Sequence, residues 1–402
     1  MKKRSLKHSN HLINTNSYKR KISASFDKIF NDINVNLDNS KNTYHVLSKK
    51  FNFNFKVKDL KKFKKFENIV LVGMGGSILG ANAIYDFLKH KIKKNYFFFD
   101  NLDSEKLIKF KKENKINKCL FIIISKSGNT IETITNFLEL RIIKYNAKNI
   151  IIITEKKESA LYSISKKYNL FFVEHKKYLG GRYSVLSEVG IIPSYLMGVD
   201  IKKLRKNLLK YFKKKDKLFL KQSTVSLSQI IKKRIYRNII FLNYSPKLEK
   251  FLYWCQQLIA ESLGKKGKGL LPIVSNSPKD HHSLLQLYFD GPRDKIFYLF
   301  GDNRIKGNKM KMKKITNKIN FLDNKKLDKV KMAQQQAIKK VLIKNKIPFR
   351  EFKINQFNEE TLGELFSYFM LEISLIGRLL NINPFDQPAV EQVKIFTKKI
   401  LS

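Results

Sequence analysis

Cysteine is scarce in this chain, and long apolar runs are missing. The 402 residues include two cysteines, Cys119 and Cys255, and both lie in apolar stretches. We therefore expect buried thiols in a reducing compartment, not the disulfide framework of a small secreted protein. No stretch of about 18 apolar residues occurs, which argues against a membrane span. The basic residues 1–21 also lack the apolar segment of a secretory signal, so we expect a cytoplasmic protein.

Acidic residues are the other shortage. The chain has 33 Asp and Glu residues against 81 Lys and Arg, a formal net charge of +48. A charge of this size ordinarily favours a nucleic acid or an anionic membrane as partner. Here the lysines are spread along the whole chain among abundant Asn, Ile, Phe and Tyr, a pattern typical of A/T-rich coding. We therefore expect solvated lysine faces and no specific nucleic-acid partner, with a positive field that attracts a dianionic substrate.

The apolar pattern predicts the fold class. A hydrophobic content of 43% is that of a globular protein, and 402 residues suffice for two domains with separate cores. Short apolar runs separated by segments of helix length predict strands at residues 69–72, 96–99, 120–124, 150–153 and 170–173, and again at 239–242, 271–274, 296–300 and 348–352. Such alternation is typical of parallel sheets covered by helices on both faces.

We therefore predict an α/β protein with two doubly wound parallel-sheet domains and helical extensions at both ends. The predicted parts are a helical extension over residues 1–60, a first domain over 61–200, a helical connector over 201–236, a second domain over 237–357 and a helical C-terminal segment over 358–402.

A glycine-rich turn, VGMGGSILG at residues 72–80, lies where a predicted strand meets a helix. Gly73, Gly75 and Gly76 allow a sharp turn with accessible N–H groups, and Ser77 opens a helix whose N-terminus favours anions. A dinucleotide site is one alternative, but the G-x-G-G spacing differs from G-x-G-x-x-G. A purely structural turn is the other, so this motif alone leaves the ligand open.

A turn crowded with polar side chains, SKSGNTIET at residues 125–133, follows the strand predicted at 120–124. Ser125, Ser127, Asn129 and Thr130 can wrap a phosphate together with backbone N–H groups and the dipole of the following helix. The alternative is a helix N-cap, which these residue types favour. Because one cap needs only one such residue, we favour the phosphate cradle.

Two charged side chains suit proton transfer. Arg182 follows two glycines in the segment GGRYS, where it can stabilise a developing oxyanion or pair with a structural carboxylate. Glu261 lies at the end of an apolar predicted helix, in the segment AESLG. There it can serve as a general base, or it can be an ordinary exposed glutamate.

Two later segments add further polar groups. The segment DHHSLLQ at residues 280–286 contains adjacent histidines, which point in different directions and therefore suit acid–base chemistry better than a shared metal. Surface histidines at a helix start are the alternative. The cysteines offer no ligand set either, so no metal site is expected. After the last long predicted helix, NINPFDQPAVEQVK at residues 381–394 contains Gln387 and Lys394.

Taken in this order, the segments resemble the phosphoglucose isomerase family, over about four-fifths of the chain from residue 68 to residue 394. The resemblance implies two sugar-isomerase domains and an enzyme that interconverts glucose 6-phosphate and fructose 6-phosphate in glycolysis and gluconeogenesis. It implies no metal or organic cofactor. In this family a histidine reaches the site from the adjacent subunit, so the resemblance also implies a homodimer.

The resemblance assigns roles by position. Glu261 corresponds to the base that moves a proton between C1 and C2, and Arg182 to the cation that stabilises the enediol(ate). His282 and Lys394 correspond to a histidine and a lysine that help to open the sugar ring. Substrate or phosphate binding is implied for Gly76, Ser77, Ser125, Lys126, Ser127, Thr130 and Gln387.

Two other functions stay open. The SKSGNT turn resembles that of dual phosphoglucose/phosphomannose isomerases, which also accept mannose 6-phosphate, whereas the segment with Gln387 favours the narrower enzyme. A non-catalytic sugar-phosphate sensor would need the phosphate turn but not Glu261, His282 and Lys394 together.

Overall fold

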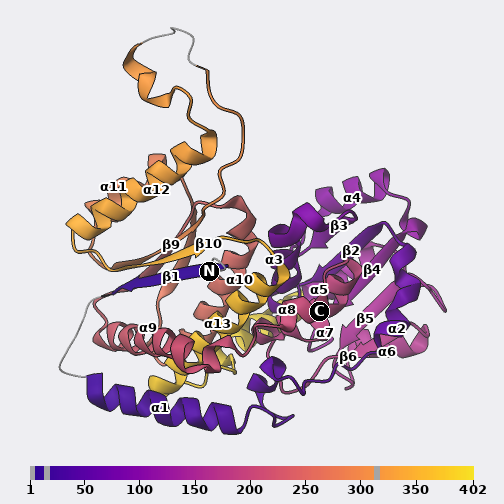
Figure 1. The fold of residues 1–402 in the computed structure, drawn as a ribbon. Coiled ribbons are helices and arrows are strands. Elements are labelled where there is room, and N and C mark those ends of the chain that lie inside the picture. Colours follow the sequence, from indigo (N-terminus) through magenta and orange to yellow (C-terminus); the bar gives the residue numbers. More distant parts are fainter. Residues whose placement is uncertain (1–4, 13–18, 312–316) are drawn as a thin grey trace.

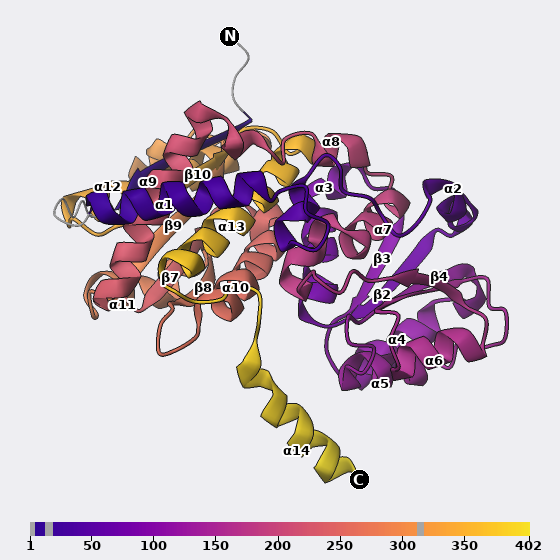
Figure 2. The same ribbon diagram turned by 90° about the horizontal axis from the view of Figure 1, so that it is seen from below.

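The computed structural model describes residues 5–12, 19–311 and 317–402. It contains two five-stranded sheets, each with helices packed against it (Figure 1). Seen from below, the first sheet and its helices lie on one side of the molecule and the second sheet lies on the other (Figure 2). The mixed α/β architecture predicted from the apolar pattern is confirmed.

The first sheet is entirely parallel. Its strands are, in spatial order, β3 (Asn95–Phe99), β2 (Asn68–Gly73), β4 (Cys119–Ile124), β5 (Ile150–Thr154) and β6 (Phe171–Glu174). Every residue of β4 and β5 is buried, because helices cover both faces. Ile69 and Leu71 pack into one hydrophobic core while Val70 and Val72 pack into another, as the alternation of side chains along a strand requires.

The helices of this unit are short. They are α2 (Val57–Leu60), α3 (Leu79–Leu88), α4 (Ser104–Glu113), α5 (Ile131–Glu139), α6 (Ala160–Lys167) and α7 (Glu188–Leu196). Three of the turns that connect strands to helices contain segments singled out from the sequence.

The second sheet has four parallel strands and one antiparallel edge strand. Its spatial order is β1 (Leu6–His11), β10 (Phe349–Ile354), β9 (Lys295–Asp302), β7 (Asn238–Asn243) and β8 (Leu271–Asn276). β1 pairs antiparallel with β10, with Leu6 opposite Ile354. The prediction of a helical N-terminal extension is therefore wrong for these six residues. Only Leu6 of these residues is buried, so the segment lacks the alternation of apolar and polar residues that marks a strand in a sequence. Backbone pairing with β10 holds it in the sheet.

The rest of the N-terminal extension includes α1 (Lys19–Val35), which is helical as predicted. Residues 1–4 and 13–18, also part of that prediction, lie outside the described residues. The segment predicted as a connector forms α8 (Ile201–Arg205) and α9 (Lys214–Lys233). Four further helices come from the second half of the chain: α10 (Glu249–Leu263), α11 (His281–Phe289), α12 (Leu327–Lys344) and α13 (Glu359–Leu379).

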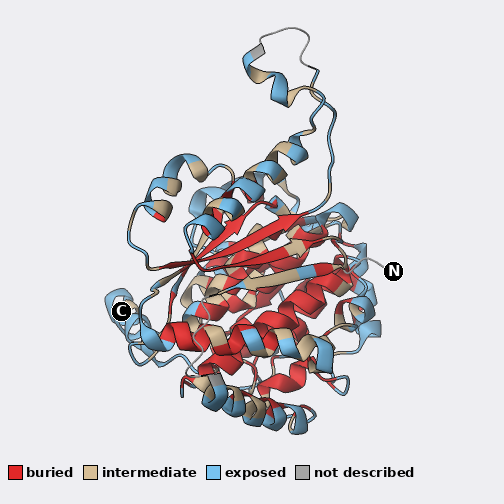
Figure 3. Ribbon diagram, turned by 60° about the vertical axis from the view of Figure 1, so that its left-hand side comes forward, coloured by how far each residue is buried: buried red, intermediate tan, exposed pale blue. Residues whose placement is uncertain are grey.

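Most of the helix α13 is buried, since 18 of its 21 residues lie in the interior. Figure 3 shows buried helices beneath a sheet. The acidic residues of α13 are neutralised in place. Glu372 forms an ion pair of 2.9 Å with Arg350, and neither side chain is exposed. Glu364 pairs with Lys210 at 2.6 Å. Because an unpaired buried charge is costly, these partners explain why the apolar run of α13 tolerates carboxylates.

The last helix, α14 (Glu391–Leu401), extends away from the body of the molecule (Figure 2). Its apolar side chains Val393, Phe396 and Ile400 are exposed. Among the described residues, no helix combines the length and apolar character that a membrane span requires. The same residues contain no cluster of three or more His, Cys, Asp or Glu side chains that suits a metal ion.

Candidate active site

The topology of the first sheet creates a binding position at the ends of β2 and β4. The strand order reverses at β2, which lies between β3 and β4. In doubly wound sheets, ligands bind beyond the carboxyl ends of the strands at such a reversal. The glycine-rich turn follows β2 and the SKSGNT turn follows β4, so the two motifs flank the expected position.

The glycine-rich turn lies against the backbone of the GGRYS segment. A Cβ atom on Gly76 would lie 2.2 Å from the carbonyl carbon of Gly181 and 2.4 Å from the backbone nitrogen of Arg182. Only a residue without a side chain allows this approach. Gly75 has a positive φ of 52°, which favours glycine as well. The contact fixes the position of Arg182 relative to Ser77.

Hydroxyl groups organise the SKSGNT turn internally. The Ser125 and Thr130 hydroxyl oxygens are 2.8 Å apart, and the N–H of Gly128 donates to the Ser125 oxygen at 3.2 Å. The N–H of Asn129 donates to the Ser127 oxygen at 3.2 Å. Thr130 is the N-cap residue of α5 but makes no side-chain capping bond. Thr130 therefore does not cap the helix through its side chain, and the hydroxyls of the cluster bond to one another and to N–H groups of the turn.

Lys126 adds a cation to this turn. Its ammonium lies 3.7 Å from a carboxylate oxygen of Glu155. Partial burial lowers the pKa of Lys126, while the Glu155 carboxylate opposes that shift. Beside it His175 is buried, and burial together with the positive charge of Lys126 lowers the pKa of that imidazole to about 4. The histidine is thus neutral at physiological pH, and it adds no positive charge beside Lys126.

Arg182 is buried, and all of its N–H groups are used. Its Nε donates to the hydroxyl of Ser262 at 2.9 Å. One terminal nitrogen donates to Glu261 at 3.1 Å and to the side-chain oxygen of Gln387 at 2.9 Å. The other donates to the carbonyl oxygens of Pro384 at 2.6 Å and Asp386 at 2.9 Å. A guanidinium has five N–H donors, so this set holds the side chain in one orientation.

Glu261 lies in the last turn of α10, where it faces Arg182. Its second carboxylate oxygen accepts a hydrogen bond of 2.9 Å from Gln257, one turn earlier on the same helix. The side chain remains about 30% exposed and borders a cavity of about 400 Å³. A carboxylate that is oriented by two donors and still open to solvent can accept a proton from a bound substrate.

The C-terminal segment reaches this site only in part. Lys265 donates to the carbonyl oxygens of Asn383 and Asp386, and to the Asp386 carboxylate, each at 2.6 Å. These bonds hold the loop that brings Gln387 to Arg182. Lys394, in contrast, is exposed on α14, and its ammonium pairs with Glu391 of the same helix at 2.7 Å.

His282 is also apart from the Arg182–Glu261 pair within this chain. It is exposed at the start of α11, the helix that follows β8 of the second sheet. Its neighbour His281 turns inward, and the Nε2 of His281 lies 2.7 Å from the Tyr244 hydroxyl. Among the described residues, the structure brings together Arg182, Glu261 and Gln387 but adds neither His282 nor Lys394 to them.

The sequence reasoning missed three residues that support the site: Ser262, Gln257 and Lys265. Gln257 had a detectable signal, because residues four apart on a helix are neighbours and Glu261 was already a candidate. Ser262 and Lys265 had none. Each acts on a partner far away in the chain, Arg182 and the 383–386 loop respectively.

Comparisons with known proteins point to one family. Residues 11–402 match the family model described as phosphoglucose isomerase. The glucose-6-phosphate isomerase of Methanocaldococcus jannaschii is 33% identical over 357 residues, which cover 84% of this chain and 85% of that protein. A probable glucose-6-phosphate isomerase of Methanococcus maripaludis is 35% identical over 84% of this chain and 80% of its own length.

A solved structure gives the same fold. The crystal structure of a glucose-6-phosphate isomerase from Chlamydia trachomatis superimposes on this chain with a TM-score of 0.75 at 16% sequence identity. The superposition covers 99% of this chain and 88% of the Chlamydia chain.

Proposed function

Because the chain belongs to the phosphoglucose isomerase family, we propose that it catalyses the reversible isomerisation of glucose 6-phosphate and fructose 6-phosphate, a step of glycolysis and gluconeogenesis. The observation that carries the proposal is the Arg182–Glu261 ion pair of 3.1 Å. It joins a base and a cation beside the turns that follow β2 and β4. Aldose–ketose isomerisation needs both, since it removes a proton next to a carbonyl group.

The phosphate group is held by the SKSGNT turn. The hydroxyls of Ser125, Ser127 and Thr130, the N–H groups of the turn and the Lys126 ammonium provide donors and positive charge for a dianion. Gly76 and Ser77 bind the substrate from the neighbouring turn. Binding energy from the non-reacting phosphate fixes the sugar over Glu261.

The proton transfer conserves the charge around Arg182. Glu261 takes the proton from C2 of the open-chain aldose, the C–H electron pair forms the C1–C2 double bond, and the negative charge moves to O1. The carboxylate becomes neutral as the enediolate becomes negative, so Arg182 exchanges one anionic partner for another. The proton of the C2 hydroxyl then passes to O1, the electrons of the C1–C2 double bond take the proton of Glu261 at C1, and the electrons left on O2 form the carbonyl group at C2. Gln387 keeps the guanidinium in place meanwhile.

We assign the opening of the sugar ring to His282 and Lys394. Neither residue contacts Arg182 or Glu261 within the described part of one chain. The proposed enzyme is a homodimer in which His282 of one subunit serves the site of the other. Three features support this: the exposed position of His282, the extended α14 that carries Lys394, and the exposed apolar side chains of α14. The buried free thiols Cys119 and Cys255 agree with a cytoplasmic location.

The decisive experiment incubates the purified protein with fructose 6-phosphate in the presence of EDTA and follows glucose 6-phosphate through a coupled dehydrogenase. Turnover is expected, because the proposed chemistry uses side chains alone. Glu261→Gln should abolish turnover and retain binding of fructose 6-phosphate in calorimetry, whereas the matched control Glu105→Gln, on an exposed helix, should behave as wild type. Retained turnover in Glu261→Gln would remove this residue as the base. Binding without turnover in the wild type would favour the sensor.

A further inference from the structure

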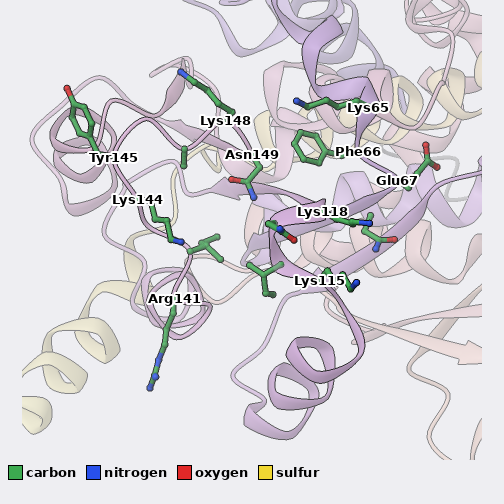
Figure 4. A pocket seen from close by; sticks show the side chains of 15 residues that line it. Lys65, Phe66, Glu67, Lys115, Lys118, Arg141, Lys144, Tyr145, Lys148 and Asn149 are labelled. Atoms are coloured by element: carbon green, nitrogen blue, oxygen red, sulfur yellow. The ribbon is translucent and has the colours of Figure 1, made fainter.

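A cavity of about 1010 Å³ lies at the amino ends of β2, β4 and β5 (Figure 4). It is formed by residues 65–68 before and at the start of β2, residues 115–118 before β4, and the loop of residues 141–149 before β5. The candidate active site lies at the opposite, carboxyl ends of the same strands. β2 has six residues, and a strand of that length spans about 20 Å.

This separation exceeds the Debye length of about 8 Å at physiological ionic strength. Charges in the cavity therefore contribute little to substrate binding at the active site.

The cavity is strongly basic. Its 15 lining residues include six cations and one carboxylate: Lys65, Lys115, Lys118, Arg141, Lys144, Lys148 and Glu67. All six cations are exposed, and within the described residues none of them forms an ion pair. In Figure 4, Lys115, Lys118 and Lys144 lie around the centre of the cavity, while Arg141 points away from it. Like charges gathered without counter-charges repel one another, and a bound anion relieves that repulsion.

The basic composition of the chain does not by itself produce this arrangement. A second basic cavity, between residues 47–53 and α8, has more of its cations paired. There Lys206 pairs with Glu360 at 2.9 Å and Lys203 with Asp200 at 3.7 Å. Arg205 donates to backbone carbonyl oxygens, including that of Leu186 at 2.9 Å. Two of the four lysines of that cavity, Lys203 and Lys206, form ion pairs, whereas the five lysines of the β2–β4–β5 cavity form none within the described residues.

We propose that the cavity at the amino ends of β2, β4 and β5 binds single-stranded nucleic acid without sequence preference. Rows of cations that follow a phosphate backbone, together with exposed aromatic rings, are the elements of such sites. The Tyr145 ring is 69% exposed and lies at the outer rim beyond Lys144 and Lys148 (Figure 4). There it can stack on a base of a strand that leaves the cavity. A phosphate polymer without bases would use the lysines but not this ring.

The test measures the fluorescence anisotropy of a labelled RNA of about 12 nucleotides at rising KCl concentrations. One variant replaces four lysines of the cavity with glutamine, and a matched control replaces four exposed lysines of α9. The cavity set is Lys115, Lys118, Lys144 and Lys148; the control set is Lys214, Lys215, Lys232 and Lys233.

The cavity variant should bind at least tenfold more weakly than the control. Its slope of log affinity against log salt should be shallower by about 3, because each phosphate contact of a single strand contributes about 0.7. Equal loss in both variants, or no RNA binding by the wild type at low salt, would overturn the proposal.

Tyr145→Ala separates nucleic acid from other phosphate polymers. It should weaken RNA binding about fivefold or more, since stacking on an aromatic ring contributes that much per base, and leave binding of inorganic polyphosphate unchanged. RNA and polyphosphate affinities that are equal and insensitive to Tyr145→Ala would assign the cavity to polyphosphate instead. Isomerase turnover should be unchanged in every variant, so a failure here is distinct from a failure of the proposed function.

Discussion

Gly76 is the residue at which the two turns of the candidate active site touch, and replacing it with alanine tests whether that contact matters. The added Cβ would lie 2.2 Å from the carbonyl carbon of Gly181 and 2.4 Å from the nitrogen of Arg182. Both are backbone atoms, so no side chain can rotate out of the way. Ordinary contact begins at about 3.4 Å, so the two turns must separate by roughly 1.2 Å, the difference between 3.4 and 2.2 Å.

A displacement of this size carries Arg182 away from Glu261 and Gln387, which it contacts at 3.1 and 2.9 Å. Misplacement of a reacting group by about 1 Å can cost about 100-fold in rate. Overpacking of a close backbone contact costs about 1–3 kcal/mol of stability. Gly76→Ala should therefore lower kcat/KM for fructose 6-phosphate about 100-fold and lower the free energy of unfolding by about 1–3 kcal/mol.

The matched comparison is Gly181→Ala, on the other side of the same contact. Its Cβ would meet the Cα of Gly76 at 3.7 Å, an ordinary contact, so activity should stay within a few-fold of wild type. Both variants are assayed by coupled turnover and by urea unfolding. Wild-type turnover and stability in Gly76→Ala, or equal losses in the two variants, would refute the reasoning.

Two further predictions follow from residues around the site. Lys265→Met removes the ammonium that holds the loop before Gln387, so kcat should fall at least tenfold with little change in urea midpoint; unchanged kinetics would contradict a role for that loop. Burial lowers the pKa of His175 from 6.5 to about 4. Between these values the unfolded chain binds a proton that the native chain excludes, so stability should fall by up to about 3 kcal/mol as the pH drops from 6.5 to 4. His175→Gln should flatten this dependence, and parallel urea profiles for the two proteins would exclude His175 as its source.

The sequence predicted the strands well where they are buried on both faces. Such strands are continuous apolar runs, as in β4 and β5, and their limits lie within a residue of those predicted. β1 was missed because only its first residue enters the core. Its other residues are held by backbone pairing with β10, and that pairing depends on the position of a strand more than 300 residues away in the chain.

The candidate site was predictable where a motif is local. The glycine and hydroxyl turns could be identified because each lies within a single strand-to-helix connection. The contact of Gly76 with the GGRYS backbone could not, since only the folded chain brings the two backbones so close that a Cβ atom on Gly76 would lie 2.2 Å from Gly181. The same holds for Ser262 and Lys265, whose residue types are common and whose partners lie about 80 and 120 residues away.

All five N–H donors of Arg182 are occupied, and this restricts how Arg182 can act in the proposed reaction. With every N–H already donated, the guanidinium can bind a substrate oxygen only by releasing an existing partner. Four of its acceptors are neutral oxygens, and only Glu261 is an anion that loses its charge during the reaction. Protonation of Glu261 weakens that one bond at the moment when the negative charge appears on the substrate. In the proposed reaction the arginine therefore becomes available through the proton transfer itself, and we expect it to bind the enediolate more tightly than the sugar.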